Sequence, residues 1–337
     1  MKYIVCEMPG SFLLKEKEIP QPQKGTSLLR VRKIGICGTD IHAFGGTQPY
    51  FEYPRILGHE LAATYMEGEA EGFEKGEAIT FIPYFNCGHC IACSNGLTNC
   101  CSSIQVFGVH IDGGMCEYIV VPDQYLLHGQ GLDYDELALV EPLAIAAHGV
   151  RRAGVNSKDT VLVMGAGPIG IGLIQFSQLS GAKVIVMDVN EHRLDFSNKE
   201  LGVSATINPL KEDVLQQLET YTNGDMPTVV IDATGNQKVM NSAFQYMSHG
   251  GRYVLVGLQK GELSFSHPEF HKREATLMSS RNATKEDFTF VIECLLSGKI
   301  DPKTYSTHRI NFEALPNQFE ELFKPGHNVI KALVELN

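Results

Sequence analysis

Apolar residues follow different patterns in the two parts of the chain. From about residue 150 onward, short β-branched runs alternate with longer segments, which is typical of strands alternating with helices. The segment Pro168–Leu179 predicts an apolar helix with Gly181 as its C-cap. The predicted strands are 159–164, Lys183–Met187, Thr228–Asp232 and Arg252–Val256. The segment Asn236–Met247, between the last two strands, continues the alternation of strands and helices. We therefore expect an α/β fold with a doubly wound parallel sheet here.

The earlier part of the chain is rich in glycine, proline and short β-like runs such as Ser27–Ile34 and Glu117–Val121. A β-rich domain is expected there. A length of 337 residues also favours two domains, because one domain commonly holds roughly 150 residues.

Charge and hydropathy exclude two classes of partner. The formal net charge is −11 and no basic patch stands out, so we expect no binding to nucleic acid or to an anionic membrane surface. The longest apolar run, Val161–Ile174, spans 14 residues and is interrupted by glycines and a proline, which is too short to cross a bilayer. Nothing in Met1–Gly10 resembles an export signal, so a cytoplasmic protein is expected.

Nine cysteines in a chain without an export signal favour metal-binding thiolates over disulfides. Four of them follow the spacing C-x2-C-x2-C-x7-C, with glycines that allow tight turns between them. A shell of four thiolates leaves no open position for a substrate, so we expect a structural zinc ion. Unligated thiols and an iron–sulfur cluster are the alternatives, and Cys100 competes with Cys101 as the fourth ligand. The expected ligands are Cys87, Cys90, Cys93 and Cys101.

A second candidate group has mixed ligand types. Cys37, His59 and a carboxylate would give a zinc ion three protein ligands and leave a fourth position for water or substrate. The candidates for the carboxylate are Glu60, next to His59, and Glu141, much further along the chain. Spacing alone leaves open that Cys37 is a core residue and that the Gly-His-Glu sequence is a turn.

The sequence Gly165-Ala-Gly-Pro-Ile-Gly170 lies between a predicted strand and a predicted helix. In this context a G-x-G-x-x-G sequence predicts a loop that holds a dinucleotide pyrophosphate at the helix N-terminus. The next strand ends in Asp188, whose carboxylate would accept hydrogen bonds from the ribose hydroxyls and repel a 2′-phosphate. We therefore expect NAD rather than NADP.

In their order along the chain, these motifs resemble the zinc-dependent medium-chain alcohol dehydrogenase family. Within it, the chain is similar to the sorbitol and threonine dehydrogenase branch, and in that branch to bacterial L-galactonate and L-gulonate 5-dehydrogenases, including a starvation-sensing oxidoreductase. The resemblance implies a GroES-like catalytic domain with two zinc sites at 1–144 and 280–337, and a Rossmann NAD-binding domain at 145–279. It also implies a homo-dimer or homo-tetramer and an active site between the domains. The segments that carry the finer likeness are 35–46, 107–114, 232–237, 268–272 and 280–284.

The resemblance also assigns roles to single residues. It implies that Cys37, His59 and Glu60 bind the catalytic zinc, with Glu141 as a further ligand or a nearby carboxylate. Thr39 would take the substrate proton and His42 would pass it to solvent. Asp40 would accept the remaining N–H of His59. The implied NAD contacts are Gly165, Gly167, Ile169, Gly170, Asp188, Arg193, Val256, Gly257, Leu258, Ser280 and Arg281.

The resemblance favours oxidation of a secondary alcohol in a sugar acid or polyol. A carboxylate substrate needs cationic or N–H partners, and His110 and Arg281 are the candidates. Alternatively, His110 is a loop histidine packed beside Asp112, and Arg281 forms an ion pair between the domains. Oxidation of L-threonine or a simple diol stays open, as does a regulatory protein that binds zinc and nucleotide without catalysis.

Overall fold

The structure, a computed structural model, describes residues 1–48, 51–302, 306–324 and 326–336. The chain divides into two compact units: unit 1 is Met1–Pro142 with Thr284–Asn337, and unit 2 is Leu143–Ala283. The resemblance implied junctions at 144–145 and 279–280, and in the structure they lie at 142–143 and 283–284. The second one coincides with Thr284, the N-cap residue of α10 (Lys285–Leu296).

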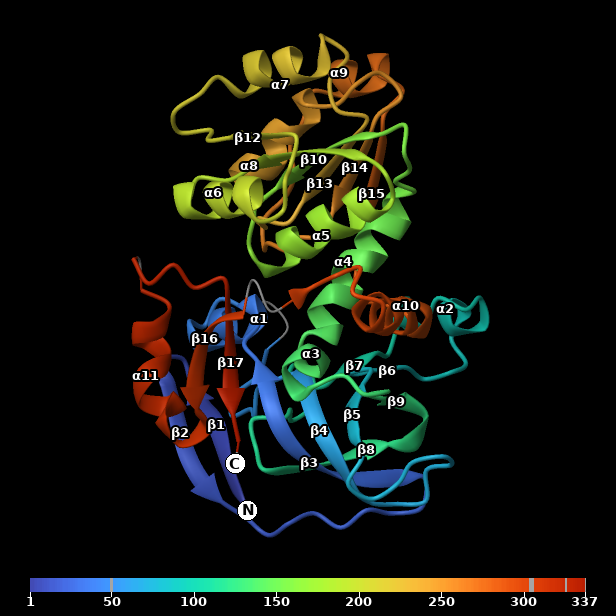
Figure 1. Ribbon diagram of the computed structural model, residues 1–337, viewed down its shortest axis with the longest axis vertical. Coiled ribbons are helices and arrows are strands. Elements are labelled where there is room, and N and C mark those ends of the chain that lie inside the picture. Colours follow the sequence, from blue (N-terminus) through green and yellow to red (C-terminus); the bar gives the residue numbers. More distant parts are fainter. Residues whose placement is uncertain (49–50, 303–305, 325, 337) are drawn as a thin grey trace. The chain divides into compact units, whose positions relative to one another are not determined.

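Unit 1 is built on a framework of strands (Figure 1), whose pairs are antiparallel except for the parallel pair β16-β17. Among its described residues, seven strands form one sheet in the order β16-β17-β3-β4-β5-β9, with β8 paired to β3. The pairs β1-β2 and β6-β7 form two small separate sheets. The strands of unit 1 are β1 (Lys2–Met8), β2 (Ser11–Glu16), β3 (Thr26–Gly35), β4 (Glu60–Glu67), β5 (Ala78–Phe81), β6 (Tyr84–Phe85), β7 (Gln105–Val106), β8 (Tyr118–Pro122), β9 (Leu126–His128), β16 (Ser306–Asn311) and β17 (Lys331–Glu335).

The helices of unit 1 are short, and most of them connect strands. Besides α10, those within the described residues are α1 (Gly38–Phe44), α2 (Ile91–Ser94), η1 (Thr98–Cys100), η2 (Asp123–Tyr125), α3 (Tyr134–Ala138), η5 (Phe312–Ala314) and α11 (Leu315–Leu322). Helix α4 (Val140–Ala153) begins in unit 1 and continues in unit 2.

An aromatic cluster joins the two ends of the chain inside unit 1. The rings of Phe12 in β2, Phe44 in α1 and Phe319 in α11 lie 4.9 to 5.0 Å apart. Tilted and edge-on contacts of this kind add to the free energy gained by burying the rings. The C-terminal segment therefore packs on the N-terminal strands, and this places β17 beside β3.

Unit 2 contains the predicted doubly wound sheet, and its six strands are all parallel. Counted within unit 2, the order β12-β11-β10-β13-β14-β15 is 3-2-1-4-5-6, the order of dinucleotide-binding folds. The topological switch point, where the order of successive strands reverses, lies between β10 and β13. Ligands of such folds bind at the carboxyl ends of the strands at this point. The elements are β10 (Thr160–Met164), α5 (Pro168–Leu179), β11 (Lys183–Met187), α6 (Glu191–Lys199), β12 (Ala205–Ile207), α7 (Val214–Thr222), β13 (Val229–Asp232), α8 (Gln237–Ser242), η3 (Ala243–Gln245), β14 (Arg252–Leu255), α9 (His267–Lys272) and β15 (Thr276–Ser279).

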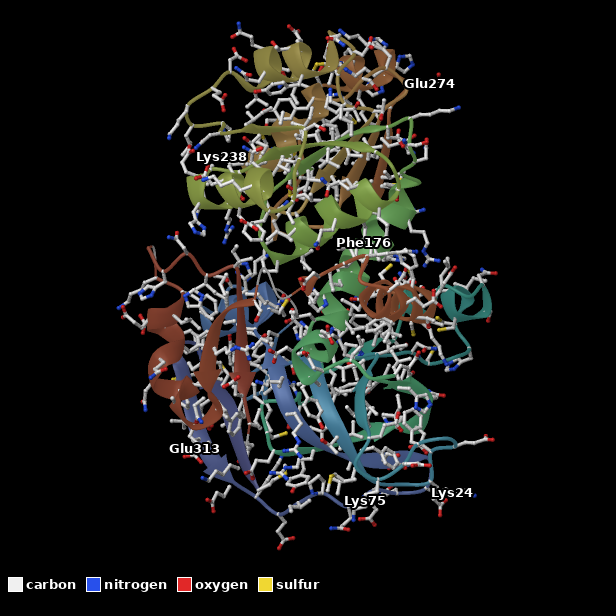
Figure 2. All side chains as sticks on the ribbon, viewed as in Figure 1. Lys24, Lys75, Phe176, Lys238, Glu274 and Glu313 are labelled. Carbon is white, nitrogen blue, oxygen red and sulfur yellow. The ribbon has the colours of Figure 1, made fainter. Side chains whose placement is uncertain are left out.

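The inner strands β10, β11 and β13 are apolar and buried along nearly their whole length, as expected for strands covered on both faces of a sheet. Leu162 and Ile185 belong to one buried cluster with Leu218 of α7 and Phe244 of η3. Helix α5 packs on β10 and β11, and its Phe176 is buried (Figure 2). No helix in the part of the chain that the structure describes has both the length and the apolar character needed to span a bilayer.

Two local predictions need correction. Helix α5 ends at Leu179 with Ser180 as its C-cap, and Gly181 is the next residue, where its left-handed φ of 83° favours glycine. The segment 236–247 is not one helix, because α8 ends at Ser242 and continues as the 3₁₀ turn η3.

A buried carboxylate fastens three strands of unit 2 at their N-terminal ends. Asp159 accepts hydrogen bonds from the Asn156 backbone N–H at 2.9 Å and from the Thr228 hydroxyl at 2.7 Å. It also pairs with Arg252 at the start of β14. Burial raises the pKa of Asp159, but these hydrogen bonds and the guanidinium outweigh it, and the pKa lies below its ordinary value.

We expect Asp159→Asn to lower the free energy of unfolding by about 2 kcal/mol near neutral pH, because hydrogen bonds to a charged group are lost. Since the folded-state pKa is depressed, the wild-type carboxylate contributes its stability above about pH 4, the unfolded value, and loses it as the pH falls further. Urea denaturation of both proteins at pH 6 and pH 3.5 measures this. If the difference in free energy of unfolding between the two proteins is not smaller at pH 3.5 than at pH 6, the charged Asp159 does not have the stabilising role assigned to it.

Candidate functional site

The four predicted cysteines come together in one loop of unit 1. Sulfur atoms of Cys87, Cys90, Cys93 and Cys101 lie within 4.8 Å of one another. Cys90 is the N-cap residue of α2, so the short helix and the turns beside it bring the sulfurs together. Cys100 is exposed and lies outside the group.

Backbone N–H groups point at these sulfurs. The N–H groups of Cys87 and Ser103 donate to Cys101 Sγ at 3.3 and 3.4 Å, and the N–H of Cys90 donates to Cys87 Sγ at 3.4 Å. Donors of this kind lower the pKa of Cys90 to about 5, whereas desolvation raises the pKa of Cys93 to about 11. Four neighbouring thiols cannot all ionise without a cation, so this chemistry fits a thiolate-bound metal ion.

The second group also forms in unit 1. Ligand atoms of Cys37, His59 and Glu60 lie within 4.8 Å of one another, and both His59 and Glu60 are buried. Cys37 is the N-cap residue of α1 and lies two residues after the end of β3, and Glu60 is the first residue of β4. Because Gly35 of β3 pairs with Glu60, the ends of these antiparallel strands bring the three side chains together.

Asp40 has a different role from the one expected. Its carboxylate accepts hydrogen bonds from the backbone N–H groups of Cys37 at 2.9 Å and Gly58 at 3.2 Å, and it does not bond to His59. Asp40 therefore holds the backbone next to two candidate ligands, rather than the imidazole ring itself. His59 Nδ1 is buried and has no hydrogen-bond partner among the described residues.

Glu141, on α4, lies near this group but outside the set of closely spaced ligand atoms. It is buried and accepts a hydrogen bond from the hydroxyl of Tyr84. Burial raises the pKa of Glu141 to about 7. Burial lowers the pKa of His59, but the negative charges of Cys37, Asp40 and Glu141 outweigh it and hold this pKa well above its ordinary value.

These residues fit a bound divalent cation. A soft thiolate, an imidazole and a carboxylate are ligands that zinc prefers, and they leave one coordination position open. The buried His59 Nδ1 without a protein partner and the local excess of negative charge both favour a cation at this place. We call the three residues Cys37, His59 and Glu60 the Cys37 centre.

Two residues that contact the carboxylates at this centre were not predicted from the sequence. Lys331 of β17 is 1% exposed and pairs with Glu60, and Tyr84 of β6 holds Glu141. A lysine or tyrosine in a short strand carries no signal that it will meet a residue far away in the sequence.

The two predicted relay residues both lie on α1. Thr39 is half-buried, and His42 is exposed. His42 Nδ1 lies 2.9 Å from the hydroxyl of Thr47. No hydrogen bond joins Thr39 to His42 within the described residues, so a proton relay between them requires a further group.

The glycine-rich loop of unit 2 has the close packing that its sequence predicted. A Cβ on Gly170 would lie 1.8 Å from the Gly165 carbonyl oxygen, so only glycine allows this approach of helix to strand. Gly165 has a φ of 92°, in the left-handed region. Gly167 is the N-cap residue of α5, and Ile169 is half-buried in its first turn.

Asp188 follows β11 and binds the glycine-rich loop. Its carboxylate accepts hydrogen bonds from the Ala166 backbone N–H at 2.7 Å and the Asn190 backbone N–H at 2.8 Å. Arg193 Nη1 lies 3.9 Å from Asp188 Oδ2. The side chain of Asp188 is only 6% exposed. Through these hydrogen bonds Asp188 fixes the shape of the loop at the carboxyl end of the sheet.

The remaining predicted contacts fall in both units. Val256 and Gly257 follow β14 and are half-buried, Leu258 is 58% exposed, and Ser280 is buried after β15. Arg281 is exposed in unit 2. His110 lies in unit 1, where its Nδ1 accepts a hydrogen bond from the Val106 backbone N–H at 2.9 Å. This bond leaves Nε2 as the N–H of a neutral ring.

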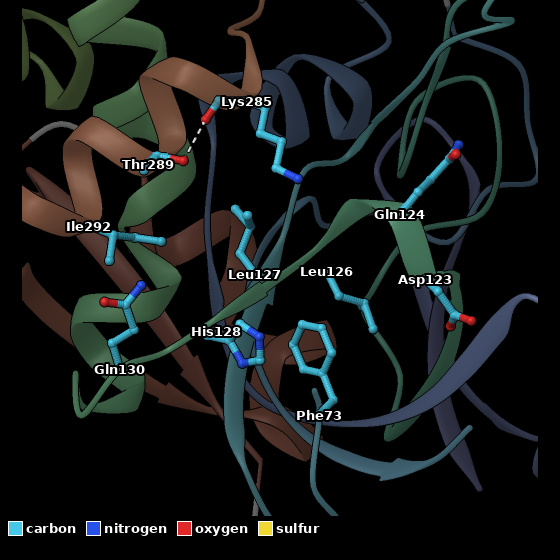
Figure 3. Close-up of a pocket in the computed structure, with 10 residues that line it drawn as sticks. All are labelled: Phe73, Asp123, Gln124, Leu126, Leu127, His128, Gln130, Lys285, Thr289 and Ile292. Atoms are coloured by element: carbon cyan, nitrogen blue, oxygen red, sulfur yellow. Dashed lines mark hydrogen bonds between the residues drawn. The ribbon is translucent and has the colours of Figure 1, made fainter. Parts of the chain in front are cut away.

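A separate pocket lies in unit 1 beside α10 and β9 (Figure 3). The rings of Phe73 and His128 stack 3.9 Å apart on one side, and Lys285 and Ile292 of α10 line it as well. None of its lining residues belongs to the Cys37 centre or to the four-cysteine group, so we assign the candidate chemistry elsewhere.

Comparison with known proteins agrees with this arrangement. Residues 23–130 match the alcohol dehydrogenase GroES-like domain, and residues 168–297 match the zinc-binding dehydrogenase family. The chain is 43% identical over 341 residues to L-galactonate-5-dehydrogenase of Escherichia coli K12, covering 99% of this chain and 98% of that protein. The chain belongs to the zinc-type alcohol dehydrogenase family.

Two other members of this family are also similar along their whole length. The starvation-sensing protein RspB of E. coli K12 is 36% identical, with 93% of each chain covered. A crystal structure from E. coli CFT073, described as the alcohol dehydrogenase rspB in complex with NADH, has a TM-score of 0.91 and 32% identity, and covers 100% of this chain and 99% of that chain. The predicted family and the combination of a GroES-like domain with a Rossmann-like sheet are thus confirmed.

Proposed function

We propose that the protein is a zinc-dependent dehydrogenase that transfers a hydride from a secondary alcohol of a sugar acid or related polyol to NAD. The observation that carries the proposal is the 43% identity to an L-galactonate-5-dehydrogenase over nearly the whole chain, together with the complete Cys37 centre. The substrate class that follows is a hexonate of the L-galactonate or L-gulonate type.

The proposal assigns the Cys37 centre to a catalytic zinc ion and the four-cysteine group to a structural one. When bound, the catalytic ion would polarise the substrate hydroxyl and lower its pKa. Cys37, His59 and Glu60 would hold it, with Glu141 as a carboxylate close by. Asp40 keeps the backbone of Cys37 and Gly58 in place.

The chain's own residues would then handle the substrate proton. Thr39, half-buried at the start of α1, would accept it, and exposed His42 would release it to solvent. Because the two side chains do not bond to each other in the described structure, a hydroxyl of the bound nucleotide or a water molecule has to connect them. His110 and Arg281 are the proposed partners of the substrate carboxylate.

The activity is tested by measuring NADH formation with L-galactonate, L-gulonate, D-sorbitol, xylitol, L-threonine and 2,3-butanediol. We expect kcat/KM for a hexonate to exceed that for the polyols by at least about tenfold, because a charged hydrogen bond to a carboxylate is worth about 1.5–3 kcal/mol. Preference for threonine or a diol would refute the sugar-acid assignment. No turnover of any of these alcohols by zinc-loaded protein would favour a regulatory binder.

Matched cysteine variants connect that activity to the Cys37 centre. Cys37→Ser should lower kcat more than about 100-fold, because it removes a ligand and not only a supporting contact. Cys100→Ser is the control, since this thiol is exposed and lies outside both groups. Equal activity of the two variants would show that the metal is assigned to the wrong residues.

The proposed preference for NAD rests on Asp188. Its carboxylate would accept hydrogen bonds from the ribose hydroxyls and repel a 2′-phosphate. Asp188→Ala should therefore reduce the ratio of kcat/KM for NAD to that for NADP by at least about tenfold, and it should weaken NAD binding. Asp195→Ala controls for the change in net charge, because Asp195 is an exposed residue of α6 paired with Lys199. An unchanged ratio in Asp188→Ala would refute the assignment.

We also propose that the protein is a homo-oligomer that forms through the edge of the sheet in unit 2. Strand β15 ends the sheet, its residues are mostly exposed, and Leu277 is 37% exposed. An open edge of this kind can pair with the same edge of a second copy. Leu277→Asp should shift the protein toward monomer in sedimentation velocity, whereas Leu210→Asp, at a more exposed leucine away from this edge, should not. A monomeric wild type would contradict the proposal.

A further inference from the structure

A lysine is fully buried beside the Cys37 centre. Lys331 is 1% exposed, although lysine is among the residues least often buried without a charged partner. Its ammonium group pairs with Glu60, whose side chain is also 1% exposed. Removing both charges from water is costly, so this pair persists only with good geometry and further hydrogen bonds.

The strand register accounts for the encounter of these two side chains. Strands β17, β3 and β4 lie side by side, and Leu333, Gly35 and Glu60 are partners across them. Lys331 lies two residues before Leu333 on β17. Its Nζ donates a hydrogen bond to the Ile36 carbonyl oxygen at 3.1 Å and reaches the Glu60 carboxylate across β3.

Gly35 provides the space for this contact. A Cβ built on Gly35 would lie 2.0 Å from Glu60 Oε2 and 2.9 Å from Glu60 Cβ. The Glu60 carboxylate therefore lies directly over the backbone of Gly35, between β4 and the lysine on β17. Gly35 has no left-handed φ, so its importance here is the absent side chain and not an unusual backbone conformation.

We propose that Lys331 is a positioning residue for the Cys37 centre: its ammonium group, together with the gap at Gly35, holds the Glu60 carboxylate in place and thereby determines how tightly the centre retains its divalent cation. The other carboxylate, Glu141, is held by the neutral hydroxyl of Tyr84. The two acidic groups are thus held differently, and only Glu60 belongs to the closely spaced ligand set.

This inference rests on the proposed function, because it requires a cation at the Cys37 centre. Its test starts from the zinc-loaded holoenzyme, which is dialysed against increasing concentrations of a zinc chelator such as dipicolinate. Zinc per chain is then measured, and the Cys37→Ser variant identifies which fraction belongs to this centre. Comparison of the midpoint chelator concentrations gives relative affinities without relying on activity.

Lys331→Met should release zinc from the Cys37 centre at a chelator concentration 10- to 100-fold lower than the wild type, the range typical for residues that orient metal ligands. Lys331→Arg should restore retention to within about fivefold of the wild type, because it keeps the charge and the donor. Lys33→Met is the matched control. Lys33 lies in β3 of the same sheet and pairs with Asp135 and Glu335, away from the centre.

Gly35→Ala tests the same geometry without removing a charge. The added methyl group would displace the Glu60 carboxylate, so the variant should lose zinc from the Cys37 centre in the same range of chelator concentration. Gly38→Ala is its control for zinc retention, since a Cβ there meets open space. Zinc retained by the four-cysteine group in every variant shows that unit 1 is still folded.

The outcomes separate the two proposals. Zinc retention in Lys331→Met and Gly35→Ala that equals or exceeds the wild type would overturn the positioning role. If the wild type and Cys37→Ser bind the same amount of zinc per chain, the Cys37 centre holds no zinc, and the proposed function would be refuted instead. In active variants, the expected change is a lower kcat with a nearly unchanged KM for NAD.

Discussion

Negative charge gathers in the interior of unit 1 where β3 ends and β4 begins. The side chain of Cys37 and the carboxylates of Asp40 and Glu141 hold the pKa of His59 well above its ordinary value, and the Glu60 carboxylate is buried beside them. Such charges cost several kcal/mol each when they are removed from water without compensation. Backbone N–H groups compensate Asp40, a hydroxyl compensates Glu141 and an ammonium group compensates Glu60. A divalent cation at the Cys37 centre would balance the charge that is left.

The topology of unit 1 is what makes this balance possible. Cys37 and Glu60 come from consecutive parts of an antiparallel sheet, but Lys331 comes from the last strand of the chain. The aromatic cluster of Phe12, Phe44 and Phe319 packs the C-terminal segment against the N-terminal strands. Because the last strand of the chain pairs with β3, the buried Lys331 lies beside the centre, and a protein that ended before β17 would lack this charge.

Features encoded by short stretches of sequence could be predicted. The four cysteines lie within 15 consecutive residues, and the loop from Gly165 to Gly170 lies between the strand and helix that it joins. Their spacing alone therefore predicts close contact. The alternation of strands and helices after residue 150 likewise predicted the parallel sheet, because each crossover connection is local.

Contacts between distant segments could not be predicted in the same way. Lys331 and Glu60 meet through the register of three strands, and Tyr84 of β6 donates a hydrogen bond to Glu141, which lies 57 residues further along the chain. Asp40 was expected to bond to His59, yet its carboxylate accepts hydrogen bonds from two backbone N–H groups instead. A residue next to a motif is easily identified as supporting it, but which atom it supports depends on backbone geometry that the motif does not contain.

Anomalous diffraction at the zinc absorption edge, from crystals of the zinc-loaded protein, would locate the metal ions directly. We expect one anomalous peak among the side chains of Cys37, His59 and Glu60, with Lys331 in contact with Glu60, and a second peak among the four cysteines. A peak at the four cysteines with none at Cys37, His59 and Glu60, in crystals supplied with excess zinc, would show that the Cys37 centre does not bind the catalytic ion.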